Sequence, residues 1–197
     1  MALSVGDTAP NFTVKDTNGI TVTLSDYAGK PVVLYFYPKD DTPGCTKEAC
    51  SFRDNYQQYL SQGITVFGVS MDDEASHQAF TSKFNLPFPL LADTDGAITK
   101  AYDVDGGGYS KRVTYVIGDD GKIQQVYTTI NTETHAADIL AAIGLSARSV
   151  TLELRGSDIS RIWLPLRRCS REVIRMRCCL DNSVTPRRRH DQQCRAQ

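Results

Sequence analysis

The sequence predicts an α/β fold in which helices flank a central mixed β-sheet. Two short apolar runs rich in β-branched and aromatic residues, PVVLYFY at 31–37 and ITVFGV at 64–69, are typical of buried strands. The segment between them has helical spacing, and a hairpin pattern at 113–128 and a closing helix follow. Strand–helix–strand followed by a hairpin and a helix implies a layered α/β fold with a mixed sheet.

The opening elements are a separate hairpin and the helix that joins the two strands. Residues 12–24 alternate around the turn pair Asn18-Gly19, which is a hairpin signal. The helix begins near Pro43 and ends at Gly63, since proline suits the first helical turn and glycine a helix end. Its buried face is predicted from apolar residues at three- and four-residue spacing, namely Ala49, Phe52, Tyr56, Tyr59 and Leu60.

The remaining predicted elements are a helix over 73–84, a strand over 88–92, a hairpin of 113–117 with 122–128 around GDDG, and a helix over 133–143. In the first of these helices, Ala75, Ala79 and Phe80 are expected to face inward. The last helix is expected to end at Gly144.

Charge divides the chain into two parts. The 197 residues carry a net charge of −1, but residues 1–147 hold 10 Lys+Arg against 18 Asp+Glu, whereas residues 148–197 hold 12 Arg, no Lys and 5 acidic residues. We therefore predict a folded domain over 1–146 and an unrelated Arg-rich and Cys-rich extension over 147–197. No run approaches the roughly 18 apolar residues of a membrane helix, and no secretory signal is visible.

Three interpretations of the extension stay open. A disordered or loosely structured segment fits its lack of a sustained helical or strand period. Clustered arginines are also typical of an arm that binds nucleic acid or acidic partners, because they neutralise phosphates. The third interpretation is a zinc site of Cys178, Cys179, His190 and Cys194, although the adjacent cysteines lack the usual ligand spacing.

Cys45 is the strongest candidate for a reactive residue. Thr42 is a favourable N-cap and Pro43 suits the first helical position, so Cys45 falls in the first turn of the helix. There, free N–H groups and the positive end of the helix dipole favour the thiolate, which is the nucleophilic form of cysteine. We interpret Cys45 as a functional cysteine rather than an inert buried one.

Cys50 lies five positions after Cys45. In an intact helix, five residues rise about 7.5 Å and turn about 500°, which puts the two Cα atoms roughly 8.5 Å apart on different faces. A disulfide needs Cα atoms within about 7 Å of each other. The two cysteines can therefore pair only if the first turns of the helix unwind, unlike the partners in the C-x-x-C motif of a disulfide exchanger.

The string P-x-x-x-T-x-x-C, present as Pro38, Thr42 and Cys45, resembles the active-site signature of the peroxiredoxins. The longer string YPKDDTPGCTKEACSFRD is similar to the peroxiredoxin Q subfamily, also called bacterioferritin comigratory proteins, and VGDTAPNFTVKDTNG and SKRVTYVIGDDGKI also fit. The resemblance covers residues 3 to about 145 and excludes the extension. It implies a thioredoxin-like fold for the predicted domain.

The resemblance also implies a role for each matching residue. Cys45 would be the peroxidatic cysteine, whose thiolate attacks a peroxide oxygen and becomes a sulfenic acid. Thr42 would donate a hydrogen bond to the peroxide, Pro38 would shield the thiolate from water, and Arg112 would stabilise the thiolate and the polarised peroxide. Cys50 would be the resolving cysteine, forming an intramolecular disulfide that thioredoxin or a similar dithiol protein reduces.

The expected function is therefore a thioredoxin-dependent peroxidase that reduces hydrogen peroxide and organic hydroperoxides without metal, haem or flavin. We expect a cytoplasmic monomer, because intramolecular resolution needs no second chain, and nucleic acid is not an expected partner. Two alternatives remain: a thioredoxin-like disulfide exchange protein, and a non-enzymatic domain whose Arg-rich extension binds nucleic acid.

Other motifs are assigned structural roles. DTDG at 93–96 and DVDG at 103–106 lack the glutamate that completes a calcium loop, so they are predicted to be turns. His77 and His135 belong to no recognisable motif and are predicted to be exposed to solvent.

Overall fold

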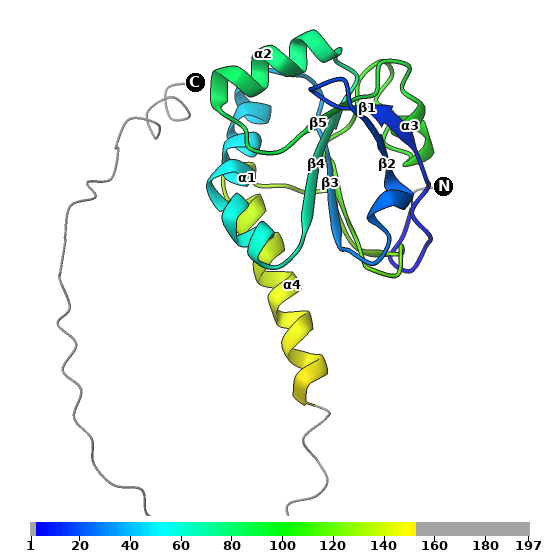
Figure 1. Cartoon of the computed structure of the whole chain (residues 1–197), viewed down its shortest axis with the longest axis vertical. Helices are drawn as coiled ribbons and strands as arrows, with labels where there is room; N and C mark the ends of the chain where they lie inside the picture. The colour runs from blue at the N-terminus through cyan, green and yellow to red at the C-terminus, as the bar shows by residue number, and fades with distance from the viewer. Residues whose placement is uncertain (1–2, 153–197) are drawn as a thin grey trace, which may run out of the picture.

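The computed structural model describes residues 3–152 of the chain (Figure 1). Its elements are β1 (Thr13–Lys15), β2 (Thr21–Thr23), η1 (Leu24–Tyr27), β3 (Val32–Phe36), α1 (Pro43–Ser61), β4 (Thr65–Ser70), α2 (Glu74–Phe84), β5 (Leu90–Ala92), α3 (Ala97–Ala101), β6 (Val113–Ile117), β7 (Ile123–Tyr127) and α4 (His135–Leu152). Within this described part, no helix has both the length and the apolar character to cross a membrane. The three interpretations of the extension concern residues outside the described ones beyond Leu152.

Five strands form one mixed sheet in the order β5-β4-β3-β6-β7. The strand β3 pairs in parallel with β4, and β4 with β5, whereas β6 and β7 add antiparallel on the other side. The helix α1 connects β3 to β4, as a parallel pair requires a crossover. The predicted α/β fold with a mixed sheet is confirmed, and so is the separate hairpin, in which β1 pairs antiparallel with β2.

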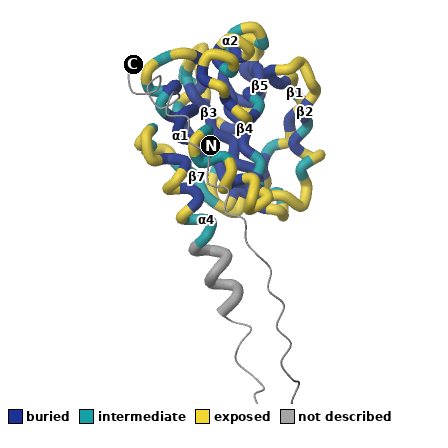
Figure 2. The backbone as a smooth tube through the Cα atoms, turned by 60° about the vertical axis from the view of Figure 1, so that its left-hand side comes forward, coloured by how far each residue is buried: buried dark blue, intermediate teal, exposed yellow. Residues whose placement is uncertain are grey.

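The sheet has a hydrophobic layer on each face. Val33 and Tyr35 of β3 belong to a core cluster shared with α1, α2 and α4. The alternate residues Val32, Leu34 and Phe36 belong to a second cluster, shared with β2 and α3. Figure 1 shows α1, α2 and α4 on one side of the sheet and α3 with the β1–β2 hairpin on the other, and Figure 2 shows the central strands β3 and β4 as buried. Both layers fix the ends of β3, and the loop after β3 leads directly into α1.

The inward face of α2 differs from the prediction. Ala75 and Ala79 are exposed, whereas His77, Phe80 and Phe84 are buried. The two phenylalanines bury far more apolar surface than the alanines would. His77 is buried because polar partners surround its ring.

Two further details of the helices differ from the prediction. Leu60 in α1 is 50% exposed, because its neighbour Tyr59 occupies the buried face and adjacent helical residues point about 100° apart. The helix α4 continues through Gly144 to Leu152, so the predicted end at Gly144 is wrong. A glycine ends a helix by adopting the left-handed conformation, and Gly144 does not adopt it.

Candidate active site

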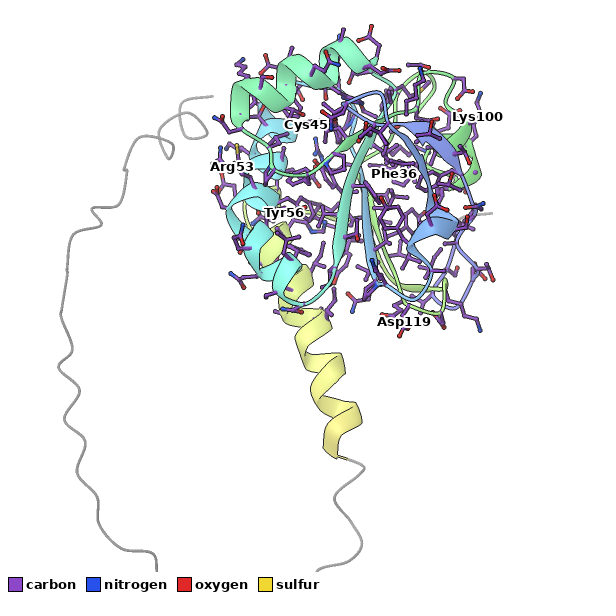
Figure 3. The ribbon with its side chains drawn as sticks, in the orientation of Figure 1. Phe36, Cys45, Arg53, Tyr56, Lys100 and Asp119 are labelled. Atoms are coloured by element: carbon purple, nitrogen blue, oxygen red, sulfur yellow. The ribbon has the colours of Figure 1, made fainter. Side chains whose placement is uncertain are left out.

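Cys45 is the third residue of α1, in the first turn after the loop from β3. Figure 3 shows it at the upper end of this helix, well separated from Asp119 at the lower edge of the view. Its side chain is a free thiol and only 2% of the residue is exposed. The early N–H groups of a helix have no helical partner and carry a partial positive charge, so this position stabilises negative charge that develops on a bound group.

Thr42 is the N-cap residue of α1, and its carbonyl accepts a 2.8 Å hydrogen bond from the N–H of Thr46. Its hydroxyl does not cap the helix as the prediction assumed. It donates instead to the carbonyl of Lys39 across 3.2 Å. The hydroxyl therefore belongs to the loop rather than to the helix, and the loop sets its position.

Arg112 reaches Cys45 because β3 and β6 are neighbours in the sheet. Phe36 pairs with Val113, so the residue before Val113 lies beside the loop that follows β3. The Nη2 atom of Arg112 donates to the Sγ atom of Cys45 across 3.1 Å. Gly44 leaves room for this contact, since a Cβ atom there would lie 3.3 Å from Nη2.

Glu48 completes this group, and the sequence analysis missed it. It lies one helical turn after Cys45, is fully buried, and its Oε2 atom accepts a hydrogen bond from Nη1 of Arg112. Burial raises the pKa of Glu48 to about 7, although the charge and hydrogen bond of Arg112 act in the opposite direction. Burial alone would lower the pKa of Arg112, but the charges of Glu48 and Cys45 raise it. The signal in the sequence was an acidic residue three positions after the cysteine, on the inward side of the helix.

The other two predicted site residues lie before and after Cys45. Pro38 is half-buried in the loop and lines a surface cavity together with Met71 and Tyr109. Cys50 is 3% exposed on the same helix as Cys45, and α1 is continuous from Pro43 to Ser61. The geometric requirement that the helix unwind before the two cysteines pair therefore applies to this structure.

The prediction that both histidines are solvent-exposed is wrong. His77 is fully buried, with Nδ1 2.8 Å from Oδ2 of Asp40. His135 is 2% exposed, and its Nε2 atom lies 2.8 Å from the hydroxyl of Thr114. Burial lowers the pKa of His135 to about 4, and the positive charge of Arg112 contributes to the lowering. Both rings are held by residues far away in the sequence, which no local pattern indicates.

The arrangement is suited to nucleophilic chemistry on a substrate that develops negative charge. The sulfur of Cys45 lies in the first turn of α1, and the guanidinium beside it is held by the buried side chain of Glu48. Fixed positive groups stabilise charge that develops on a departing oxygen without having to reorganise during the reaction.

Comparison with known proteins identifies the family. The model of the AhpC/TSA family matches residues 5–126. A chloroplastic peroxiredoxin Q of Triticum aestivum is 48% identical over 145 residues, which cover 72% of this chain and 67% of the wheat protein. A bcp-type peroxiredoxin of Coxiella burnetii is 42% identical over 151 residues, which cover 73% of this chain and all of that protein. The chain belongs to the peroxiredoxins of the AhpC/TSA family.

Solved structures agree with this assignment. The crystal structure of a cysteine-to-serine variant of PrxQ from Xylella fastidiosa matches with a TM-score of 0.70 and 32% identity, covering 75% of this chain and 99% of that one. The resemblance to peroxiredoxin Q and the thioredoxin-like fold are thereby confirmed. Peroxiredoxins are thiol-dependent peroxidases, and the chain is an enzyme of this class.

Proposed function

We propose that this peroxiredoxin reduces hydrogen peroxide and organic hydroperoxides at Cys45, and that Cys50 then forms a disulfide with it. The observation that carries the proposal is the 3.1 Å contact between Nη2 of Arg112 and Sγ of Cys45 in the first turn of α1. It combines the nucleophile, a helix N-terminus and a fixed positive charge at one point.

In the first step, the thiolate of Cys45 attacks one oxygen of the peroxide. An S–O bond forms, the O–O bond breaks, and its electron pair leaves with the other oxygen, which takes up a proton to become water or an alcohol. The sulfur is oxidised to a sulfenic acid and the peroxide is reduced. Arg112 stabilises the thiolate and the leaving oxygen, and Pro38 excludes water. The hydroxyl of Thr42 has one proton, so it turns from the carbonyl of Lys39 to donate to the peroxide.

In the second step, with Cys50 reduced to a thiol, its sulfur attacks the sulfenic sulfur of Cys45. An S–S bond forms, the S–O bond breaks, and the oxygen leaves as water. Because α1 holds the two residues about 8.5 Å apart, its first turns must unwind first. A dithiol reductant of the thioredoxin type then reduces the disulfide and restores both thiols.

The organisation of the protein is proposed on the same basis. A disulfide within one chain needs no second copy, which supports a monomer, and the acidic domain over 1–146 supports no role for nucleic acid. The helix α4 continues past residue 146 to Leu152, so a truncation that tests the division between domain and extension is best made after this helix. A cytoplasmic location is supported by the bacterial bcp-type relative, whereas the wheat relative is chloroplastic.

The test is peroxide consumption by the full chain with thioredoxin and its reductase. Cys45→Ser should abolish it, because a hydroxyl is a far weaker nucleophile than a thiolate at neutral pH. Cys50→Ser is the matched control, since it should still consume one equivalent of peroxide in a single turnover. Full turnover by the Cys45→Ser variant would refute the assignment.

A further inference from the structure

We propose that Asp40 is a positioning residue for the reaction at Cys45, and that a His77 protonated on both ring nitrogens holds it in place. This rests on the peroxidase function proposed above. Asp40 lies midway between Pro38 and Thr42 in the loop that leads into α1. Its side chain points into a buried polar cluster, which joins this loop to three other parts of the fold.

The carboxylate of Asp40 has three hydrogen-bond partners, although the residue is only 7% exposed. Its Oδ1 atom accepts from the hydroxyl of Tyr37 across 2.7 Å, and its Oδ2 atom accepts from the hydroxyl of Ser76 across 2.7 Å. Nδ1 of His77 lies 2.8 Å from the same Oδ2 atom. The side chain thus links the loop to the residue that follows β3 and to two residues of α2.

The backbone of Asp40 is held as well. Its N–H donates to Oδ2 of Asp72 across 2.8 Å, and this oxygen also accepts from the hydroxyl of Ser70 at the end of β4. The next residue, Asp41, forms an ion pair with Lys83 of α2 at the surface. An exposed ion pair of this kind contributes little to stability, so the interior contacts of Asp40 are the ones that hold the loop against α2.

The surroundings of His77 place an oxygen atom beside each ring nitrogen. Nδ1 faces the carboxylate of Asp40, and Nε2 lies 3.2 Å from the carbonyl oxygen of Leu91 in β5. A carbonyl oxygen only accepts, and an ionised carboxylate only accepts, so both contacts are hydrogen bonds when the imidazole is doubly protonated. Its positive charge then balances the buried carboxylate, as buried charges require.

The charged and titratable groups around this pair are consistent with an ionised Asp40. Burial alone would raise the pKa of Asp40, but the hydrogen bond and charge of His77, with the hydroxyls of Tyr37 and Ser76, hold it below its ordinary value. Asp72 accepts from the backbone of the loop rather than from the ring. The ring of His77 contacts only oxygen acceptors in the hydrogen bonds of the described residues.

The position of the cluster separates its effect from that of Arg112. Asp40 fixes the loop from which Pro38 and the hydroxyl of Thr42 approach the substrate, whereas Arg112 and the first turn of α1 act on the sulfur directly. Losing the Asp40 anchor should therefore impair the reaction with peroxide, which needs the Thr42 donor. It should spare the alkylation of Cys45 by iodoacetamide, which does not need that donor.

The experiment measures both rates on the full chain, with Cys45 followed by peptide mass mapping. Asp40→Ala should slow oxidation by hydrogen peroxide by about 10-fold or more, since small misplacements of a positioning group have effects of this size, while the alkylation rate is unchanged. Asp40→Asn should stay within about 3-fold of wild type, because the amide keeps the geometry. It can accept from Tyr37 and donate to a neutral His77.

The matched control is Asp41→Asn, which removes the adjacent surface ion pair at a backbone φ of 53° that asparagine tolerates. It should leave both rates unchanged. If Asp40→Ala does not fold, Tyr37→Phe removes one hydrogen bond to the carboxylate and should still slow oxidation selectively. Equal losses in both rates, no loss of the peroxide rate, or the same loss in Asp41→Asn would overturn the positioning role.

Nitrogen-15 NMR of the imidazoles tests the protonation of His77. We expect two protonated ring nitrogens in the wild type at neutral pH and one in Asp40→Asn. A single protonated nitrogen in the wild type would overturn the ionised pair. An inactive wild type would instead contradict the proposed peroxidase function, so the two failures are distinguishable.

Discussion

Glu48 and Arg112 form an ion pair in which the side chain of Glu48 is fully buried while that of Arg112 is 23% exposed. The same guanidinium also contacts the sulfur of Cys45. One positive charge is therefore shared by two groups that become negative on ionisation, and the more deeply buried of them loses its proton with difficulty. The ionisation of Glu48 in the folded state can therefore be measured through the pH dependence of the free energy of unfolding.

The first prediction concerns Glu48→Gln. The pKa of Glu48 is raised from 4.5 to about 7, so the folded state holds this proton at pH values where the unfolded chain has lost it. The free energy of unfolding should therefore fall as the pH rises through this window, by an amount on the order of 3 kcal/mol. Glutamine does not titrate, so the variant should lose this slope. Urea unfolding at a series of pH values measures it.

Glu133→Gln is the matched control for that experiment. Glu133 is an exposed glutamate paired with Lys47, and its replacement should leave the slope unchanged. Identical slopes for Glu48→Gln and the wild type would contradict the raised pKa of Glu48.

The second prediction concerns the guanidinium of Arg112. Its two terminal nitrogens bond different partners, and the single ammonium of a lysine cannot reproduce this geometry. We expect Arg112→Ala to slow the oxidation of Cys45 by roughly 100-fold or more, as for other fixed donors to a developing anion. Arg112→Lys should also be slow, despite its positive charge. Stopped-flow kinetics with hydrogen peroxide measure both.

Lys111→Ala removes the neighbouring exposed cation and should keep the wild-type rate. A wild-type rate in Arg112→Lys would show that charge alone suffices, without the paired geometry.

The third prediction concerns the path from sulfenic acid to disulfide. After full reduction of the wild type by a dithiol, one equivalent of peroxide should give a link between Cys45 and Cys50. This link should raise amide hydrogen exchange in the first turns of α1, because those turns must unwind. Cys50→Ser should keep the first oxidation but accumulate sulfinic acid under excess peroxide. A link from Cys45 to Cys169, Cys178, Cys179 or Cys194 in the peptide map would count against resolution by Cys50.

The sequence predicts the elements of this fold better than the contacts between them. Strands such as β3 can be predicted because an apolar run and the prolines that flank it are local signals in the sequence. Arg112 was found through a motif, but its contact with Cys45 depends on the register between β3 and β6. Glu48 was missed because a glutamate on a helix is usually exposed. His77 was misassigned because its partner Asp40 is 37 positions away.

The last prediction concerns His135, whose titration acts in the opposite direction to that of Glu48. Burial lowers the pKa of His135 from 6.5 to about 4, and the rings of Phe52 and Tyr127 pack edge-on against the imidazole. The unfolded chain therefore binds this proton first as the pH falls. The free energy of unfolding should decrease from about pH 6.5 to 4, by an amount on the order of 3 kcal/mol.

His135→Asn should remove this loss of stability at acid pH, because asparagine does not titrate. In the wild type, Glu48 and His135 change the free energy of unfolding in opposite directions over the pH range in which both titrate. A nearly constant stability in that range would therefore hide both contributions. Glu48→Gln alone should then make stability rise with pH in the overlap, and His135→Asn alone should make it fall. An imidazole that NMR shows to be charged near pH 6 in the folded chain would contradict the lowered pKa and remove the opposition between the two variants.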